Sequence, residues 1–214
     1  MKKNNYHLHL ISAVTVGLFI FIAFGSGEDK KNEDDSTAEE TEKATTPAQL
    51  TAQLKREVAS FDKPFDGSTY RGTIESIQME VVLFSVWANI VDEGMNSKNA
   101  ADKKLALALK NKAAARQIKE FPKMRKAYAD IVATKLWENN VYVTIQGTKN
   151  SIINLTGGLF ANNKNIADTQ TKLIEILTQL RFKEVRYRWY KDESEFNYYK
   201  VESPKDADVV KSKS

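Results

Sequence analysis

A long uncharged stretch near the N-terminus constrains this chain more than any other feature. Residues 4–27 contain no Asp, Glu, Lys or Arg, and the apolar core of the stretch, residues 10–24, has the sequence LISAVTVGLFIFIAF. A soluble domain would have to bury such a segment on all sides. Because it follows Lys2 and Lys3, the pattern predicts a signal peptide or a signal-anchor helix over residues 1–27.

The same segment predicts where the rest of the chain lies. Residues 23–25, Ala-Phe-Gly, have the small-x-small form of a cleavage site, but bulky residues 19–24 run directly up to it, which favours retention as a transmembrane helix. The basic N-terminus should stay in the cytoplasm, although Lys30 and Lys31 flank the other end. We therefore expect the domain outside the cytoplasm, in the periplasm or at the cell surface, and secreted if the signal is cleaved.

An acidic tether is predicted between this segment and the domain. Residues 28–46 contain no aromatic side chain and no aliphatic one larger than alanine, so they cannot bury enough apolar surface to fold and should be disordered. Residues 28–47 carry a net charge of −5, whereas residues 48–214 carry +7 in a chain of +4. This basic domain favours anionic partners, although an ordinary solubilising surface would show the same mild excess.

A single α+β domain is predicted over residues 47–203, followed by a frayed polar tail over residues 204–214. Thr46, Pro47 and Gln49 form a helix-start signal, with an N-cap hydroxyl, a proline at the first helical position and a glutamine three residues after the cap. Leucines at helical spacing follow, so the first helix should begin here.

Two more helices complete the helical part of the domain, residues 47–138. The second is expected over residues 69–93, with Gly94 ending it. The third should start near Ala100. Pro122 should then either kink this helix or start a new one, because proline lacks the backbone N–H that a helix interior needs.

The remaining residues, 139–203, predict a ββαββ sheet unit. Alternating apolar and polar residues indicate strands at 141–146 and 151–156, a helix from about residue 165, and a hairpin formed by residues 184–191 and 195–202. With the preceding helix, this order matches a permuted ferredoxin-like arrangement. We take that match as an analogy of fold, which implies no function.

Missing residue types exclude several kinds of chemistry. The chain has no cysteine, and its two histidines, His7 and His9, both lie in the N-terminal segment, where they suit the polar edge of a membrane span better than a metal site. The domain therefore lacks Ser-His and Cys-His nucleophiles and the usual zinc ligands. We expect no metal and no cofactor.

Glu80 is the candidate catalytic residue. At helical spacing it falls in the middle of the apolar stripe of the second helix, one turn from both Ile77 and Phe84. Burial there would raise the pKa of the carboxyl group, as in a general acid. An ordinary buried ion pair with an arginine such as Arg116 or Arg125 explains the same pattern.

A basic and aromatic strand near the C-terminus supplies the candidate binding residues. Arg186, Arg188 and Tyr190 alternate with Val185, Tyr187 and Trp189, so the first three should share one face of a strand. Arginine and tyrosine together suit phosphate, carboxylate or sugar groups. Alternatively, the arginines pair with nearby acids such as Glu184 and Glu195.

These features favour a non-enzymatic binding or interaction module, tethered to a membrane by its N-terminal helix. Its partner would be an anionic envelope component or another protein, while nucleic acid is an unlikely partner for an exported domain. The alternative is a carboxylate-dependent hydrolase of cell-wall or surface glycans. That alternative needs two carboxyl groups about 5–10 Å apart in a cleft, with Glu80 as one of them.

Overall fold

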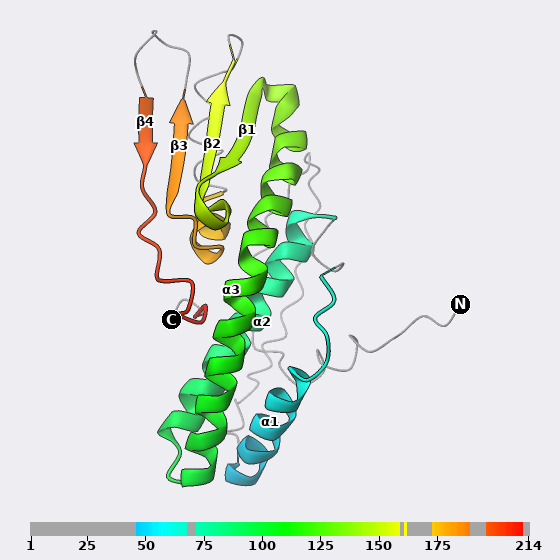
Figure 1. Cartoon of the computed structure of the whole chain (residues 1–214), viewed down its shortest axis with the longest axis vertical. Helices are drawn as coiled ribbons and strands as arrows, with labels where there is room; N and C mark the ends of the chain where they lie inside the picture. The colour runs from blue at the N-terminus through cyan, green and yellow to red at the C-terminus, as the bar shows by residue number, and fades with distance from the viewer. Residues whose placement is uncertain (1–45, 68–71, 159–160, 162–172, 189–195, 212–214) are drawn as a thin grey trace, which may run out of the picture. The chain divides into compact units, whose positions relative to one another are not determined.

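Three long helices and a four-stranded mixed sheet make up the described part of the chain, which is an α+β fold as expected (Figure 1). The computed structural model describes residues 46–67, 72–158, 161, 173–188 and 196–211. All of them belong to one unit, Lys43–Ser214. The expected membrane helix and Tyr190 lie outside the described residues, as does the tether as far as residue 45.

The first helix, α1 (Pro47–Ser60), begins at the predicted capping box. Thr46 N donates to Gln49 Oε1 over 2.9 Å, and Gln49 N donates to Thr46 Oγ1 over 3.4 Å, so each residue satisfies a backbone donor of the other. The second helix, α2 (Ile74–Asn96), begins with a similar box between Thr73 and Ser76. The predicted start of α1 is therefore confirmed.

Gly94 does not end α2, contrary to the prediction. The helix continues to Asn96, and Gly94 is buried where α2 meets the other two helices. A Cβ atom at this position would lie 2.7 Å from the Ala106 Cβ and 3.1 Å from the Leu54 Cδ1. The glycine therefore serves close helix packing, and the extended backbone of Ser97 ends the helix.

The third helix, α3 (Ala100–Leu136), continues through Pro122. The proline leaves one carbonyl of the preceding turn without its helical N–H donor, but it does not end the helix. Asn150 Nδ2 donates to the Pro122 carbonyl oxygen over 2.8 Å. A short 3-10 helix, η2 (Trp137–Asn139), and the left-handed backbone of Asn140 then lead into the sheet.

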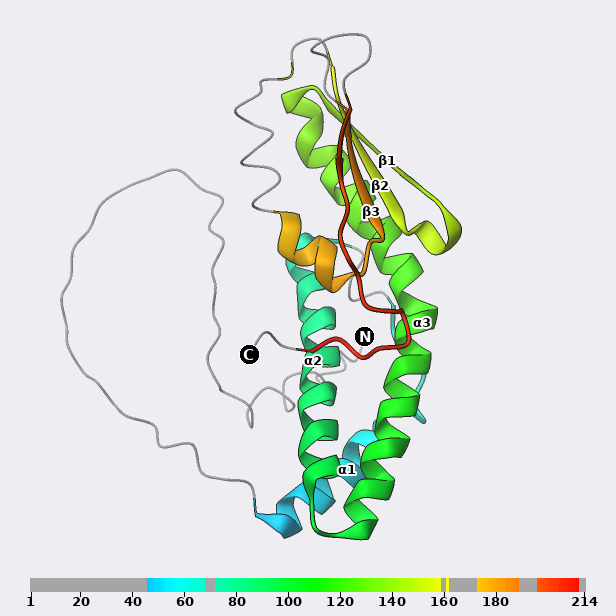
Figure 2. The same ribbon diagram turned by 90° about the vertical axis from the view of Figure 1, so that its left-hand side faces the viewer.

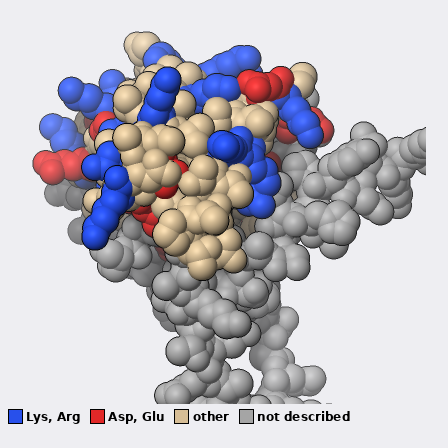
Figure 3. All heavy atoms as spheres, turned by 90° about the horizontal axis from the view of Figure 1, so that it is seen from below, with Lys and Arg blue, Asp and Glu red and all other residues tan. Residues whose placement is uncertain are grey.

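Asp102 ties together the end of the bundle where α1 and α3 begin. Its carboxylate is fully buried and accepts hydrogen bonds from Thr51 Oγ1 over 2.6 Å and from Ser97 Oγ over 2.8 Å. The α2–α3 turn therefore lies beside the start of α1. Figure 3 looks onto this end, where Lys and Arg side chains surround an area of uncharged surface.

The core of the bundle follows the predicted apolar stripe of α2. Phe84 packs edge-on against both Trp87 and Phe121, with ring centroids 5.2 Å apart in each pair. The predicted stripe residues are all buried: Ile77, Val81, Phe84, Trp87 and Val91. Among the described residues, α2 alone is long and apolar enough to span a bilayer.

The sheet consists of β1 (Val141–Gln146), β2 (Ile152–Gly157), β3 (Glu184–Arg188) and β4 (Phe196–Tyr199), in that order. The β1–β2 and β3–β4 pairs are antiparallel, whereas β2 and β3 are parallel. Residues 173–179, between β2 and β3 in sequence, are helical.

This strand order differs from the ferredoxin-like analogy. The ferredoxin-like fold contains a split βαβ unit, in which another strand lies between the two strands that a helix connects. Here β2 and β3 are direct neighbours in the sheet. The sequence pattern predicted four strands in this part of the chain, but it did not contain their order across the sheet.

The segment after β4 is packed against the bundle, which differs from the expected frayed tail. The chain returns from the sheet and crosses α3 to reach α2 (Figure 2). Val209 and Val210 are buried, and Lys211 Nζ pairs with Asp92 on α2. Gln117, a fully buried residue of α3, binds the segment with both ends of its amide group.

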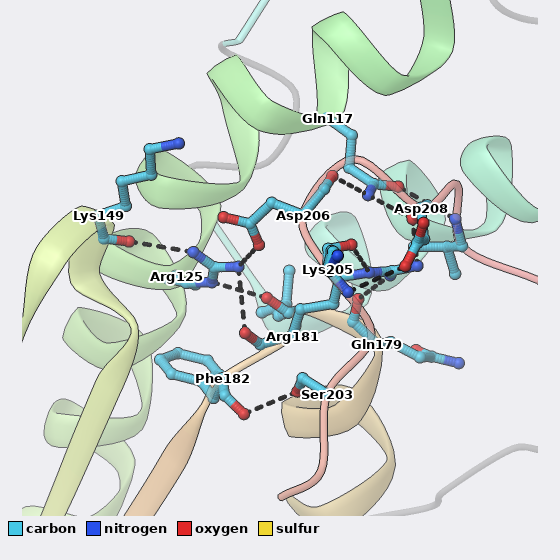
Figure 4. A network of polar contacts seen from close by, with 12 residues as sticks. Gln117, Arg125, Lys149, Gln179, Arg181, Phe182, Ser203, Lys205, Asp206 and Asp208 are labelled. Carbon is cyan, nitrogen blue, oxygen red and sulfur yellow. Dashed lines mark hydrogen bonds and ion pairs between the residues drawn. The ribbon is translucent and has the colours of Figure 1, made fainter. Parts of the chain in front are cut away.

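Two buried arginines hold this C-terminal segment (Figure 4). Arg125 Nη2 donates to Asp206 Oδ1 over 2.6 Å, and Arg125 Nε donates to the Leu180 carbonyl oxygen over 2.7 Å. Arg181 donates to the carbonyl oxygens of Lys205 and Asp208. Buried charges require such partners, so these contacts fix residues 205–208 in place.

Candidate functional site

Helices cover one face of the sheet, and no described helix covers the other, which we call the open face (Figure 2). On β3, Val185 and Tyr187 point into the core, with exposed fractions of 0% and 4%. Arg186 is half-buried and Arg188 is exposed, because alternate residues of a strand face opposite sides. The structure therefore brings Arg186 and Arg188 together on the open face.

A row of polar side chains crosses the open face through Arg186. Thr144 on β1 is in register with Asn154 on β2, Asn154 with Arg186 on β3, and Arg186 with Tyr198 on β4. Asn154 Nδ2 donates to Thr144 Oγ1 over 3.2 Å. The register therefore places hydrogen-bonding groups from all four strands side by side.

Arg186 also has an acidic partner on its own strand. Its Nε and Nη2 atoms donate to the two carboxylate oxygens of Glu184 over 2.8 Å and 3.1 Å. The hydrogen bonds lower the pKa of Glu184 and raise that of Arg186. The acid pairing that the sequence offered as an alternative is thus present for Arg186, while Glu195 lies outside the described residues.

Exposed aromatic side chains stand on the outer strands of the open face. Tyr142 on β1 packs edge-on against Trp137, with ring centroids 5.3 Å apart, and both rings are exposed. Tyr198 on β4 is 62% exposed. Tyrosine and tryptophan provide large contact areas at modest entropic cost and are enriched in binding surfaces, so the open face has the composition of one.

Glu80 lies in a different environment, inside the helical bundle. It is buried, and its charge acts on the guanidinium of Arg116, an α3 residue that also interacts with Glu120. Arg116 is held over the rings of Phe61 at 4.1 Å and Trp87 at 5.7 Å. Burial lowers the pKa of Arg116, and the carboxylates of Glu120 and Glu80 oppose that shift.

The surroundings of Glu80 are those of a packed core. Glu57, a buried acid on α1, accepts a hydrogen bond from Trp87 Nε1 over 3.2 Å and pairs with Arg56. A shallow groove of about 640 Å³ runs along α3 from Pro122 to Thr134, and neither Glu80 nor the strand arginines line it. In the described residues, no group of three acidic, histidine or cysteine side chains could hold a metal ion.

Part of the site could not be found from the sequence. Thr144 and Asn154 join the row only through the cross-strand register, which the sequence pattern does not contain. Tyr198 lay on the predicted partner strand, but its position opposite Arg186 likewise depends on register. The alternating polar residues on β1 were the sequence signal that one face of this strand is polar.

Comparisons with protein-family models, with curated proteins and with solved structures found no match. The fold and the site therefore define a structural class only. That class is an α+β domain with a three-helix bundle at one end and an open, polar and aromatic sheet face at the other (Figure 1).

Proposed function

We propose that this chain is a membrane-tethered, extracytoplasmic binding module whose open sheet face binds an anionic envelope component or a protein partner. The observation that carries this proposal is the sheet face itself. It presents Arg186 and Arg188 beside Tyr198, and no described helix covers it. An uncovered face of arginine, amide and tyrosine groups suits recognition of carboxylate, phosphate or sugar groups.

The organisation of the chain supports a tethered module. The apolar segment over residues 1–27 has the composition of a signal-anchor helix, and the acidic residues 28–46 have that of a flexible spacer. The domain begins at the capped start of α1, directly after the spacer. A folded domain on such a spacer could engage partners at the membrane surface while it remains attached.

The buried position of Glu80 favours a binding module over the glycan hydrolase. A hydrolase of that kind needs an accessible acid and a second carboxylate across a cleft. Glu80 instead lies within the bundle, close enough to Arg116 for their charges to interact. The carboxylate therefore has the partner expected of a structural ion pair.

The double variant Arg186→Ala with Arg188→Ala tests the proposed face. We expect weaker retention on isolated cell wall or on a polyanion resin, with a flatter dependence on salt, because each lost arginine removes a screened attraction. The melting temperature should change little, since ion pairs at the surface contribute little to stability. Pull-downs at two salt concentrations, together with a melting curve, provide both measurements.

Two comparison variants sharpen this test. Glu184→Gln should strengthen retention, because it releases Arg186 from its acidic partner. Lys119→Ala with Lys126→Ala removes the same number of positive charges from exposed positions on α3 and should have a smaller effect. Lower stability of the arginine variant with unaltered binding would show that both arginines serve the fold, and the sheet face would no longer support a binding function.

A further inference from the structure

The bundle end far from the sheet carries a second surface with its own chemistry. Leu107 on α3 is 50% exposed and Met95 on α2 is 44% exposed. Four exposed lysines accompany these two apolar side chains. We call this surface the basic end patch, and its members are Met95, Lys98, Lys103, Lys104, Leu107 and Lys110.

Helical geometry places these residues on one side of the α2–α3 pair. Lys103 and Lys104 lie four and three residues before Leu107, and Lys110 lies three residues after it. Residues at these spacings are neighbours on a helix surface, so all three lysines flank Leu107 on α3. Gly94 and Ala106 face each other where the two helices cross. Met95 follows Gly94, and Leu107 follows Ala106. Because the two helices are antiparallel, these next residues point to the same side of the pair.

The lysines of the basic end patch have no ion pair among the described residues. Most of the nearby acidic side chains already have other partners. Asp102 is buried with two hydroxyl donors, Asp92 pairs with Lys211, and Glu93 is the remaining exposed acid at this end of α2. The positive charge of the patch is therefore left for a partner outside the domain.

One lysine of the patch, Lys103, lies where helices disfavour a positive charge. Lys103 lies four residues after the N-cap Asn99, near the positive end of the α3 dipole, where a cation is disfavoured. The acid of this first turn, Asp102, is buried and accepts hydrogen bonds from Thr51 and Ser97, and no ion pair joins it or another described acid to Lys103. A cation without an ion pair at such a position is a candidate for interaction with something else.

A bilayer with anionic head groups fits this patch. Exposed apolar side chains can enter the boundary between head groups and acyl chains, while lysines extend their ammonium groups to the phosphates. The chain also enters the domain at this end, since α1 begins beside the α2–α3 turn through the Thr51–Asp102 hydrogen bond. A membrane anchor before residue 28 would therefore lead to the patch.

The length of the tether is suited to this contact. Residues 28–45 could extend to about 60 Å and, as a flexible chain, would average about 20–25 Å end to end. A tether of that length keeps the patch near the membrane at an effective concentration of about a millimolar. Weak intrinsic attraction then suffices for docking.

We propose that the basic end patch docks onto an anionic lipid surface and holds this end of the bundle at the membrane. The sheet lies at the opposite end of the domain (Figure 1), so its open face takes no part in the docking. This inference rests on the membrane tether of the proposed function. It adds the lipid partner, the residues that contact it and the end of the bundle that faces the membrane.

The absence of cysteine allows a direct test with single labels on the full-length chain. Leu107→Cys carries an environment-sensitive fluorophore, and the chain is reconstituted into vesicles of phosphatidylcholine with or without phosphatidylglycerol. We expect a blue-shifted emission, quenched by spin-labelled lipid, in the anionic vesicles only. Trp137→Cys, an exposed site beside the sheet, should report water in both kinds of vesicle.

A charge variant identifies the groups that dock. Lys103→Gln, Lys104→Gln and Lys110→Gln together should lower the ratio of docked to undocked domains about a hundredfold, because each lysine near an anionic surface changes binding about fivefold. The blue shift should then be lost. A melting curve of each labelled variant confirms that it is folded, as expected for substitutions at exposed positions.

Failure of the anchor and failure of the patch give different results. Vesicle flotation in high salt reports the anchor, whereas the Leu107 label at low salt and excess lipid reports the patch whether or not the anchor inserts. An aqueous emission at Leu107 in anionic vesicles would overturn the docking proposal. So would a blue shift that needs no vesicles and grows with protein concentration, since it would indicate contact with a second copy.

Discussion

At the scale of single residues, the hydroxyl of Tyr128 is buried without a hydrogen-bond partner among the described side chains. Its ring lies 6.2 Å from that of Phe182 in the core, and burial raises its pKa well above 10.0. We expect Tyr128→Phe to stabilise the domain by about 1 kcal/mol, because the ring stays and an unsatisfied polar atom leaves. A denaturant titration measures this change. A loss of similar size would mean that the hydroxyl has a partner.

Tyr187 predicts how stability depends on alkaline pH. Burial raises its pKa to about 12 from 10.0, so the folded domain keeps the phenol proton after the unfolded chain has lost it. Below pH 10, the contribution of Tyr187 to the free energy of unfolding should not change with pH. This contribution should then fall by about 3 kcal/mol as the pH rises from about 10 to 12.

The variant Tyr187→Phe isolates this effect in urea titrations across the same pH range. Its stability should fall less steeply above pH 10 than that of the unaltered domain. Identical slopes for the Tyr187 variant and the unaltered domain would contradict the assigned burial of the phenol.

The sequence predicted buried residues better than their partners. Helical spacing placed Trp87 and Glu80 on the apolar stripe of α2, and both are buried. Arg125 is buried on α3, but the sequence offered it only as a partner for Glu80. Its partners include Asp206 and carbonyl oxygens of distant segments, such as that of Leu180, and no local pattern indicates them.

At the scale of elements, Gly94 shows how tertiary packing overrides a local signal. Glycine in a helix interior normally costs about 1 kcal/mol relative to alanine, so Gly94→Ala would ordinarily stabilise the domain. Here the new Cβ would lie 2.7 Å from the Cβ of Ala106. We expect a loss of about 1–3 kcal/mol, because α2 and α3 must separate.

The reciprocal change provides the control for this prediction. Combining Gly94→Ala with Ala106→Gly moves the methyl group to the other helix and should recover much of the lost stability, as measured by thermal unfolding. A stable Gly94→Ala single variant would contradict the close approach of the helices.

Element boundaries were predicted only where the signal is local. The capping residues Thr46 and Gln49 lie three residues apart, so the start of α1 was predicted, whereas α2 begins at Ile74 and not at residue 69. The end of α2 and the passage of α3 through Pro122 depend on contacts with other segments, such as Asn150 with the Pro122 carbonyl. The order of strands in the sheet depends on long connections in the same way.

At the scale of the whole molecule, composition divides the chain into segments with separate tasks. The apolar residues 1–27 and the acidic residues 28–46 are predictions from sequence that lie outside the described residues, apart from Thr46. The domain supplies two surfaces. The sequence indicated the arginines of the open sheet face, but it did not indicate the basic end patch. Their positions at opposite ends follow from the fold.

Membrane fractionation of the full-length chain tests the central claim of a membrane-tethered module most directly. The apolar segment should insert hydrophobically, so the chain should stay in the membrane fraction after high-salt washing and be released by detergent. A shortened chain that begins at Thr46 should lose this salt-resistant attachment. Recovery of the uncleaved, full-length chain in the cytosol would contradict the account.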